Sequence, residues 1–286
     1  MVENNSFQVK PNHSTELLQF YERLKGGNVA TSDAIKTVRD LLLLELIPGM
    51  KMVIACDSDG GIGPKEKDLV QVPGEVLGHF AARVPLMEIL ASGAVPALVV
   101  NTLSVEMEPT GSTIIAGIRD ETAAAGMDAE KMVTGSTEDN VPTVQTGLGV
   151  VVIGFVTGED FRPGKSISDD LVICVGSPKS APDDEVTLDD SEITDTHCVK
   201  ILAGLDFVHD ILPVGSKGIA HEQSELAHCA GLTLVPAEDP GVDIFKSAGP
   251  STCVLVSVPP DTVDKVRSVV QQPVFAVGRL VENQTK

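Results

Sequence analysis

The stretch that decides the fold of this chain is Met-Val-Ile-Ala-Cys-Asp-Ser-Asp-Gly-Gly-Ile-Gly-Pro-Lys, residues 52–65. A short apolar run typical of a β-strand ends here in two acids, three glycines and a lysine: Asp57, Asp59, Gly60, Gly61, Gly63 and Lys65. Acids at the end of a strand can hold Mg²⁺, glycines let backbone N–H groups approach a phosphate, and a lysine can neutralise it. The segment fits a site for a magnesium–nucleotide complex. A strand followed by a glycine-rich turn explains the same residues, and that alternative stays open.

The composition of the chain limits its size class and its partners. A length of 286 residues fits two medium-sized domains, and a hydrophobic fraction of 42% is enough to build their cores. The formal net charge of −20 repels nucleic-acid phosphates and anionic membranes, so we expect neither as a partner. ATP is also an anion, so an ATP site in this chain needs bound cations and locally placed lysines.

The cysteines and the apolar runs indicate the compartment. The five cysteines are widely spaced and include no Cys-x-x-Cys pair, which is typical of reduced thiols. Residues 1–15 are polar and lack the apolar segment of a signal peptide. The longest apolar runs, such as 147–156, contain glycine and are too short to cross a bilayer. We therefore expect a soluble, cytoplasmic protein.

The order of helix and strand patterns predicts two α/β units. In the first half, caps and periodicity predict helices over 14–25, 32–46, 76–92 and 110–125, and strands over 52–56, 97–103, 131–135 and 144–156. In the second half they predict strands over 171–176, 253–258 and 273–278, and helices over 195–204, 219–231 and 260–270. The polar stretch 157–168 reads as a linker. We expect domains over 1–157, with 1–44 as a helical extension, and 158–286.

Other candidate motifs carry little weight. The chain has no Gly-x-x-x-x-Gly-Lys-Ser/Thr motif, so it is not a P-loop kinase, and it has no Gly-x-Ser-x-Gly elbow. His79, His209 and His228 lack the paired spacing of zinc ligands. We interpret the acidic run as a solvated loop rather than a metal site; its members are Asp183, Asp184, Glu185, Asp189 and Asp190.

The order of motifs along residues 45–286 resembles the aminoimidazole ribonucleotide synthetase superfamily, which includes thiamine-monophosphate kinase, selenophosphate synthetase and a hydrogenase-maturation protein. Residues 59–65 look like its Asp-Gly-x-Gly-x-Lys segment with one residue inserted, and 88–96 match its Asp-Ile-x-x-x-Gly-Ala-x-Pro. Asn101 falls where an aspartate often ends the next strand, and 135–138 sit where Gly-Gly-Asp/Glu-Thr is usual. Residues 247–256 resemble the last glycine turn and strand of the second domain.

The resemblance implies a fold and an activity. The first domain would pair with its twin in a homodimer through a shared β-barrel flanked by helices, and the second domain would be an α/β sandwich. ATP would bind between the domains, with carboxylates of the first domain holding Mg²⁺. Segments 54–63, 106–111 and 134–140 look like the α-ribazole kinase branch, whose members are expected to phosphorylate the 5′-hydroxyl of α-ribazole, a nucleoside-like substrate, in cobalamin nucleotide-loop salvage.

The same resemblance implies roles for individual residues. The metal ligands would be Asp57, Asp59, Glu88, Glu138 and Asp139. Nucleotide contacts would come from Gly60, Gly61, Gly63, Lys65, Asn101, Gly135, Ser136, Thr137, Lys217 and Gly218. The catalytic residues would be Asp57 and Asp59, to which we add Glu222, because it follows Lys217 by one helical turn and could reach an acceptor hydroxyl as a general base. Each also has a structural explanation: Glu88 could face solvent, Asn101 could cap a strand end, and Lys217 could be merely exposed.

Two departures from the family pattern bear on the site. The usual acid of Gly-Gly-Asp/Glu-Thr is Thr137 here, and a carboxylate follows one place later at Glu138, where a strand end would point it to the opposite face. Either the loop is re-aimed or Asp139 substitutes. Kinase relatives also carry Ser-Asp-Gly-Leu where this chain has Ser-Lys-Gly-Ile, residues 216–219. A lysine at a helix start suits a bound anion, so we expect Lys217 and the neighbouring N–H groups to bind phosphate.

Two other functions remain open. A ring-closing ligase of the same superfamily would release ADP and inorganic phosphate instead of a phosphorylated product. A nucleotide-binding scaffold without activity would follow if the altered residues at 137–138 and 217 mean that the metal site has decayed.

Overall fold

The first sheet is organised around two long strands, β3 (Met50–Gly60) and β8 (Gly147–Thr157), which pair antiparallel along their whole length. The computed structural model describes residues 12–26 and 34–283, and in this part of the chain the sheet has six strands in the order β1-β2-β3-β8-β6-β7. The other members are β1 (Ile35–Val38), β2 (Leu41–Ile47), β6 (Val95–Leu103) and β7 (Val133–Thr137). Neighbouring strands are antiparallel except β6 and β7, which are parallel.

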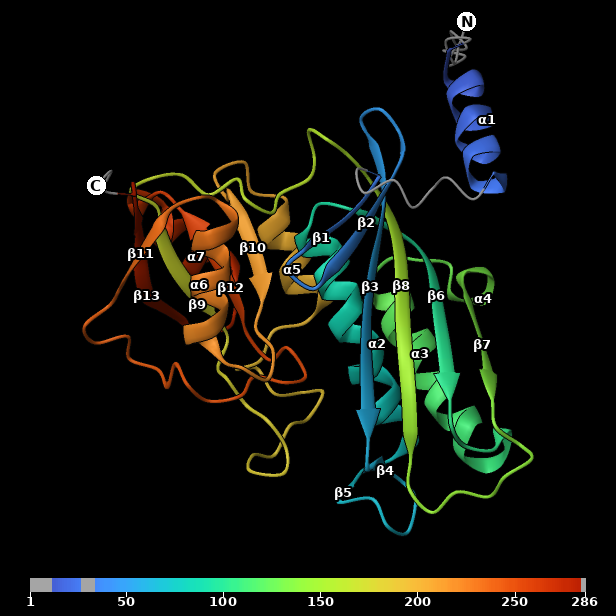
Figure 1. The fold of residues 1–286 in the computed structure, drawn as a ribbon. Helices are drawn as coiled ribbons and strands as arrows, with labels where there is room; N and C mark the ends of the chain where they lie inside the picture. Colours follow the sequence, from blue (N-terminus) through green and yellow to red (C-terminus); the bar gives the residue numbers. More distant parts are fainter. Residues whose placement is uncertain (1–11, 27–33, 284–286) are drawn as a thin grey trace, which may run out of the picture.

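Helices α2 (Gly74–Ala91) and α3 (Ser112–Ala124) cover one face of this sheet (Figure 1). Side chains alternate along a strand, so Val53 and Ala55 of β3 point toward these helices and are buried. On α2, Leu86 packs in this core while Met87 packs in a second core that includes strands of the second sheet. A helix that is apolar on several sides is buried, so α2 is a wall that both lobes share.

The opposite face of the first sheet, here called the outer face, is apolar; α2 and α3 lie on the other side (Figure 1), and the described helix α1 contacts the sheet at β2. Its residues on the four central strands are Leu42, Leu44, Met52, Ile54, Leu98, Val100, Val151, Ile153 and Phe155. One cross-strand row runs from Leu42 through Ile54 and Ile153 to Leu98. Leu42 is 41% exposed and Leu98 45%. A sheet normally buries its apolar face against a second layer, and residues 12–26 and 34–283 of one copy do not form a complete layer of this kind here.

The second lobe contains an antiparallel sheet of five strands in the order β10-β12-β9-β13-β11. The strands are β9 (Leu171–Val175), β10 (Asp210–Pro213), β11 (Thr233–Pro236), β12 (Val254–Val258) and β13 (Val274–Val281). Helices α5 (Thr196–Ala203) and α7 (Val263–Val269) share one core with the sheet, and α6 (Ile219–Cys229) packs in a separate one. Helices thus flank both faces, so the predicted two-unit α/β fold is confirmed; β10 and β11 were not predicted.

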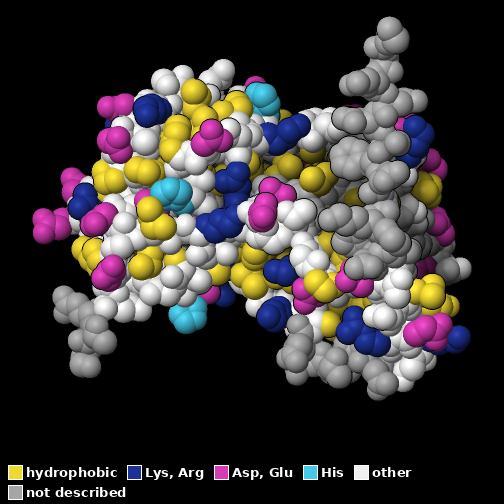
Figure 2. Space-filling model, turned by 90° about the horizontal axis from the view of Figure 1, so that it is seen from above, with side chains coloured by type: hydrophobic (Ala, Val, Ile, Leu, Met, Phe, Trp, Pro, Cys, Tyr) yellow, Lys and Arg dark blue, Asp and Glu magenta, His cyan; other side chains and the backbone are white. Residues whose placement is uncertain are grey.

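Several short elements complete the described chain. They are α1 (Asn12–Lys25), α4 (Ala129–Met132), β4 (Ile62–Gly63), β5 (Val70–Gln71), a wide helical turn over Met107–Gly111 and a single 3₁₀ turn over Pro260–Thr262. None of the helices described is both long and apolar enough to span a bilayer. Acidic side chains are spread over both lobes in Figure 2, so the charge of any cleft has to be judged from its own residues.

The helix predicted over 32–46 is wrong. Residues 32 and 33 lie outside the described residues, and the rest forms the hairpin β1–β2 with Arg39 and Asp40 at its turn. Leucine favours helices when it stands alone, but here Leu41 and Leu43 alternate into the core and are at most 3% exposed. Pairing of β2 with β3 satisfies the backbone and overrides the local preference.

The strand predicted over 52–56 is longer than expected. It continues as β3 to Gly60, so Asp57 and Asp59 lie inside a strand rather than in a loop. Because they are two residues apart, they point to the same face, the one that α2 covers. The predicted domain boundary after residue 157 falls at the end of β8 and stays a prediction.

Candidate functional site

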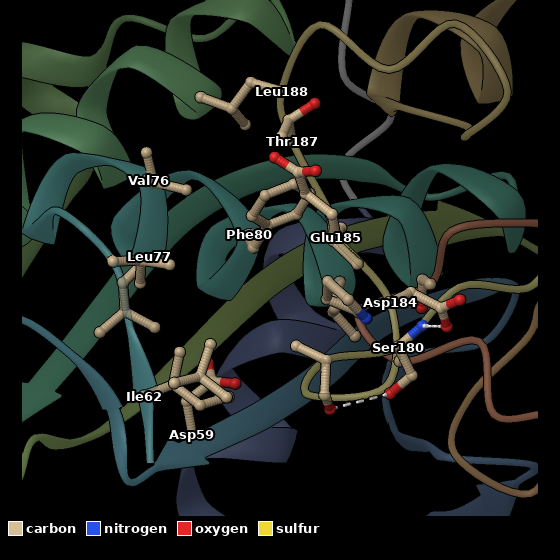
Figure 3. A pocket seen from close by; sticks show the side chains of 18 of the residues that line it. Asp59, Ile62, Val76, Leu77, Phe80, Ser180, Asp184, Glu185, Thr187 and Leu188 are labelled. Atoms are coloured by element: carbon tan, nitrogen blue, oxygen red, sulfur yellow. Dashed lines mark hydrogen bonds between the residues drawn. The ribbon is translucent and has the colours of Figure 1, made fainter. Parts of the chain in front are cut away.

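A cleft of about 870 Å³ lies where the end of β3 and the first half of α2 meet three loops of the second lobe (Figure 3). The first lobe contributes Asp57, Ser58, Asp59, Ile62, Val70, Gln71, Val72, Pro73, Val76, Leu77, Phe80 and Val84. The second lobe contributes segments 180–181, 184–189 and 215–216, with Ser247, Gly249, Pro250 and Ser251. The volume is in the range of small-molecule sites. Asp57 and Asp59 are the predicted site residues that line the cleft.

Both strand aspartates are held in an environment that disfavours their charge. Removal from water raises the pKa of Asp59 to about 7, and the neighbouring charge of Asp57 adds to the effect. Burial also raises the pKa of Asp57. No ion pair within the described part of the chain involves either carboxylate. Carboxylates that are buried without a counter-charge are typical of sites that receive a cation from outside.

Two further predicted acids lie close to these, one on each lobe. Burial raises the pKa of Glu88 on α2 to about 8, and its charged neighbours include Asp57 and Glu222. Burial also raises the pKa of Glu222 on α6 to about 7, while Lys217 acts in the opposite direction. Glu88 does not face open solvent as one alternative held. The structure thus brings Asp57, Glu88 and Glu222 within electrostatic reach of one another.

The hairpin turn of β1–β2 adds two residues that the sequence analysis missed. Asp40 raises the pKa of Asp57, Glu88 and Glu222, so it belongs with them. We call Asp40, Asp57, Asp59, Glu88 and Glu222 the acid group. Arg39, with a φ of 54°, crosses to the second lobe, where its Nη2 lies 2.5 Å from Oδ2 of the fully buried Asp210. The helix prediction over this segment hid both residues.

The acid group has the ligand type that suits a magnesium ion, but it does not form a complete coordination site by itself. All its donors are carboxylate oxygens, the ligands that Mg²⁺ prefers. Among the described residues, no three His, Cys, Asp or Glu side chains are gathered closely enough to hold a metal on their own. Mg²⁺ usually takes only one or two carboxylates and completes its shell with water and substrate phosphates. The group therefore fits a cation that arrives with a phosphorylated ligand.

The predicted phosphate contacts at the start of α6 lie beside the cleft. Gly215 and Ser216 line it, while Lys217 is exposed, with Nζ 3.4 Å from Nε2 of His221. Gly218 precedes the helix with a φ of 79°, and a Cβ there would lie 2.7 Å from the carbonyl oxygen of Lys246. Glycine at 218 is thus required by packing, whatever it binds.

Three other predicted residues, Lys65, Thr137 and Asp139, lie in a separate cluster with Glu106 and Thr110, which were not predicted; we call these five residues the edge cluster. Lys65 forms an ion pair with Glu106, which also accepts a hydrogen bond from Thr110. These two donors lower the pKa of Glu106 to about 2. Asp139 accepts hydrogen bonds from the amide of Met107 and the hydroxyl of Thr137, which lower its pKa. Neither Lys65 nor Asp139 lines the cleft.

The remaining predicted residues also lie outside the cleft. Glu138 accepts hydrogen bonds from the amides of Asn140 and Val141, so its carboxylate caps its own loop. Asn101 is 2% exposed and donates to the carbonyl of Thr134, while its Oδ1 has no hydrogen-bond partner among the described residues. A Cβ at Gly135 would lie 2.3 Å from that oxygen, so this glycine serves packing. The other four are Gly60, Gly61, Gly63 and Ser136, and none of them lines the cleft.

Gly61 is committed to local structure as well. Its amide donates to the carbonyl of Thr146, and its own carbonyl accepts from the amide of Leu69. The glycine-rich segment therefore makes a turn that connects β3 to β4, and the amide of Gly61 is not free for a phosphate in this arrangement.

Comparison with known proteins identifies the fold. No family model matches the chain, and no curated protein sequence matches it significantly. Among solved structures, "AaThiL complexed with AMPPCP and TMP" aligns over 98% of this chain and 94% of that chain, with 13% identity and a TM-score of 0.59. Thiamine-monophosphate kinase from Stenotrophomonas maltophilia K279a aligns over 92% and 93%, with 16% identity and a TM-score of 0.56.

A hydrogenase-maturation protein, E. coli HypE, aligns over 81% of this chain and 80% of its own, with 14% identity and a TM-score of 0.60. The chain thus has the two-lobed α/β fold of these proteins, as the resemblance to the aminoimidazole ribonucleotide synthetase superfamily predicts. At these identities the similarity concerns the fold.

Proposed function

We propose that this protein is an ATP-dependent small-molecule kinase whose chemistry takes place in the cleft between the lobes. The observation that carries the proposal is the pair Asp57 and Asp59, which line this cleft without any cation partner among the described residues. The fold supports it, since proteins with this fold have been crystallised with the nucleotides AMPPCP and ADP.

Phosphoryl transfer needs positioning and charge neutralisation more than covalent chemistry. When bound, Mg²⁺ would neutralise the phosphate oxygens and orient the leaving group. Asp57 and Asp59 would hold it, with Glu88 behind them. Lys217 is an exposed cation at the start of α6 whose charge acts on Glu222, and it would bind a phosphate there. Lys65, which pairs with Glu106, would first have to exchange that partner before it could bind ATP.

Glu222 is our candidate for the general base that accepts the proton of the acceptor hydroxyl. It is 7% exposed, and its pKa of about 7 matches the operating range of such a base. It lies in the first turn of α6, just after the cleft-lining residues Gly215 and Ser216. Asp57 and Asp59 would act on the metal, and Glu222 on the acceptor.

For the acceptor we propose the 5′-hydroxyl of α-ribazole, as in cobalamin nucleotide-loop salvage. This rests on the resemblance of segments 54–63, 106–111 and 134–140 to the α-ribazole kinase branch. The competing assignment is a ring-closing ligase of the superfamily that the chain resembles, because the similarity to solved structures such as "T. maritima PurL complexed with ADP" (TM-score 0.55) concerns the fold and the nucleotide alone.

A homodimer is part of the proposal. The outer face of the first sheet is apolar, and the described residues of one copy leave side chains such as Leu42 and Leu98 exposed on it, although the chain carries a net charge of −20. A second copy that placed the same face against it would supply the missing layer around a two-fold axis. Light scattering should give the mass of two chains, and Ile153→Glu on this face should give the mass of one.

Incubation with Mg²⁺-ATP and a panel of nucleosides tests the activity. We expect ADP formation together with a product heavier than α-ribazole by one phosphate. Asp57→Asn with Asp59→Asn should abolish both signals, whereas Asp261→Asn, at an exposed acid that does not line the cleft, should not. ADP with free inorganic phosphate would favour the ligase, and nucleotide binding without turnover would favour the scaffold.

A further inference from the structure

We propose that residues 184–189 and the facing side of α2 form the acceptor-binding part of the cleft, and that this part selects an uncharged, ring-bearing acceptor over an anionic one. The inference rests on the proposed function and adds to it the residues that select the substrate. We call residues 184–189 the acceptor wall. It is part of the acidic run that the sequence analysis interpreted as a solvated loop.

The first observation is that the acceptor wall lines the cleft opposite an apolar surface. All six residues from Asp184 to Asp189 border the cavity, so this loop is not only solvated surface. On the other side, Val76, Leu77 and Phe80 project from α2, and Figure 3 shows Leu188 and Thr187 of the wall bordering the same space. Apolar side chains on both sides suit a flat apolar ring.

The second observation is the charge of the lining. The described residues that line the cleft include five acids and no lysine, arginine or histidine. The acids are Asp57, Asp59, Asp184, Glu185 and Asp189. Mg²⁺ can neutralise the phosphates of ATP next to the strand aspartates. A phosphate on the acceptor, next to the wall, would meet like charges, which strongly disfavour binding.

The two lysines that flank the wall, Lys179 and Lys246, do not change this conclusion because they are already paired, and Lys217 lies at the start of α6, where the proposed function assigns it to a phosphate of ATP. Lys246 lies 2.6 Å from Asp184, and Lys179 lies 2.6 Å from Asp190 and 2.7 Å from Glu192. Lys246 thus neutralises Asp184, and Lys179 holds the end of the loop through Asp190 and Glu192. Glu185 and Asp189 form no ion pair with any described residue, so they give the wall its negative charge.

The negative charge of the acceptor wall does not suit an acceptor that already carries a phosphate. A neighbour in fold is a thiamine-monophosphate kinase, whose named substrate carries a phosphate before the reaction. A site for such a substrate needs cations or amide donors at the acceptor end. The cleft of this chain offers carboxylates there instead.

The test uses two ligands that differ by one phosphate group: a benzimidazole riboside and the same riboside with a 3′-phosphate. Their dissociation constants are measured by titration calorimetry in the presence of Mg²⁺-AMPPCP. We expect the uncharged riboside to bind at least about tenfold more tightly, with the difference shrinking at high salt. Equal affinity, tighter binding of the phosphorylated form, or no binding of either would overturn the proposal.

Variants that reverse the charge of the acceptor wall test whether its carboxylates cause the preference for the uncharged riboside. Glu185→Lys with Asp189→Lys should remove the preference, whereas Asp183→Lys, in the same loop but outside the lining, should keep it. All three residues are exposed, so folding is not at stake. A preference that survives the double reversal would overturn the role of the wall. Phosphoryl transfer is assayed separately: a riboside that binds as expected without being phosphorylated contradicts the proposed function alone.

Discussion

The cleft and the edge cluster both collect carboxylates of the first lobe, but they hold them in opposite states. In the edge cluster, Lys65 and Thr110 lower the pKa of Glu106 to about 2. In the acid group, burial raises the pKa of Asp59 to about 7 and that of Glu88 to about 8. Carboxylates are thus paired with donors in the edge cluster, where they stabilise the fold. Asp57 and Asp59 have no cation partner among the described residues at the cleft, where a ligand would bind. This difference marks the candidate site more clearly than the acids themselves do.

The largest change in stability should come from replacing Arg39. Its positive charge lowers the pKa of Glu88 and of Glu222, against the effect of burial. Arg39→Met leaves the fully buried Asp210 without its partner, which should cost about 3–5 kcal/mol in the free energy of unfolding. Denaturant titration measures it. Arg119→Met is the control, since its pair with Glu130 is exposed and contributes about 1 kcal/mol or less. Equal effects of both variants would contradict the account.

The second prediction compares the acid group with the edge cluster by the activity that a variant of each retains. Asp59→Asn should lower kcat/KM about 10²–10³-fold, as expected when one group that stabilises the transition state is lost. Glu106→Gln should change activity only slightly because its partners are structural. Steady-state assays of ADP formation compare them. A larger loss in Glu106→Gln than in Asp59→Asn would reverse the assignment of the two regions.

Part of this contrast could be predicted from the sequence. Asp57 and Asp59 follow an apolar run at a spacing of two, so strand geometry alone puts them on one face. Lys65 could not be interpreted correctly in this way. Its partner Glu106 lies 41 residues away, and nothing near Lys65 in the sequence indicates the pair.

The place of Asp40 in the acid group and the position of the acceptor wall also depend on contacts between distant parts of the sequence, which local sequence patterns do not reveal. Asp40 joins the acid group only because Leu41 and Leu43 fold as a strand against β3, contrary to the preference of leucine for helices. The acceptor wall faces α2 only because the second lobe packs on that helix through residues such as Met87. Its sequence alone resembles any acidic loop.

The third effect is a dependence of stability on pH with a defined sign. Glu88 has an ordinary pKa of 4.5 and a folded-state pKa of about 8, so the folded state binds more protons than the unfolded state between these values. Stability without Mg²⁺ should therefore fall as the pH rises from 4.5 to 8. Glu88→Gln should raise Tm at pH 8 and flatten this slope. Thermal scans in EDTA test it, and a lower Tm of the variant at pH 8 would contradict it.

The smallest effect has the opposite sign. The pKa of Glu106 is lowered to about 2, so its pairing stabilises the protein fully above pH 4.5 and is lost as the pH falls through 2. Glu106→Gln should lower the stability at pH 7 by about 1 kcal/mol, because the pair is partly exposed. Chemical denaturation at pH 7 and pH 3 measures the change, which should be smaller at pH 3. A stabilising effect at pH 7 would contradict the contrast with Glu88.

The most direct measurement is the binding of AMPPCP by titration calorimetry, with and without Mg²⁺, to the wild-type chain and to Asp57→Asn with Asp59→Asn. The central claim is that the acids without cations receive a metal-bound nucleotide. It predicts one nucleotide per chain, binding that needs Mg²⁺, and its loss in the double variant but not in Glu106→Gln. Nucleotide binding of equal strength without Mg²⁺, or unchanged in the double variant, would contradict it.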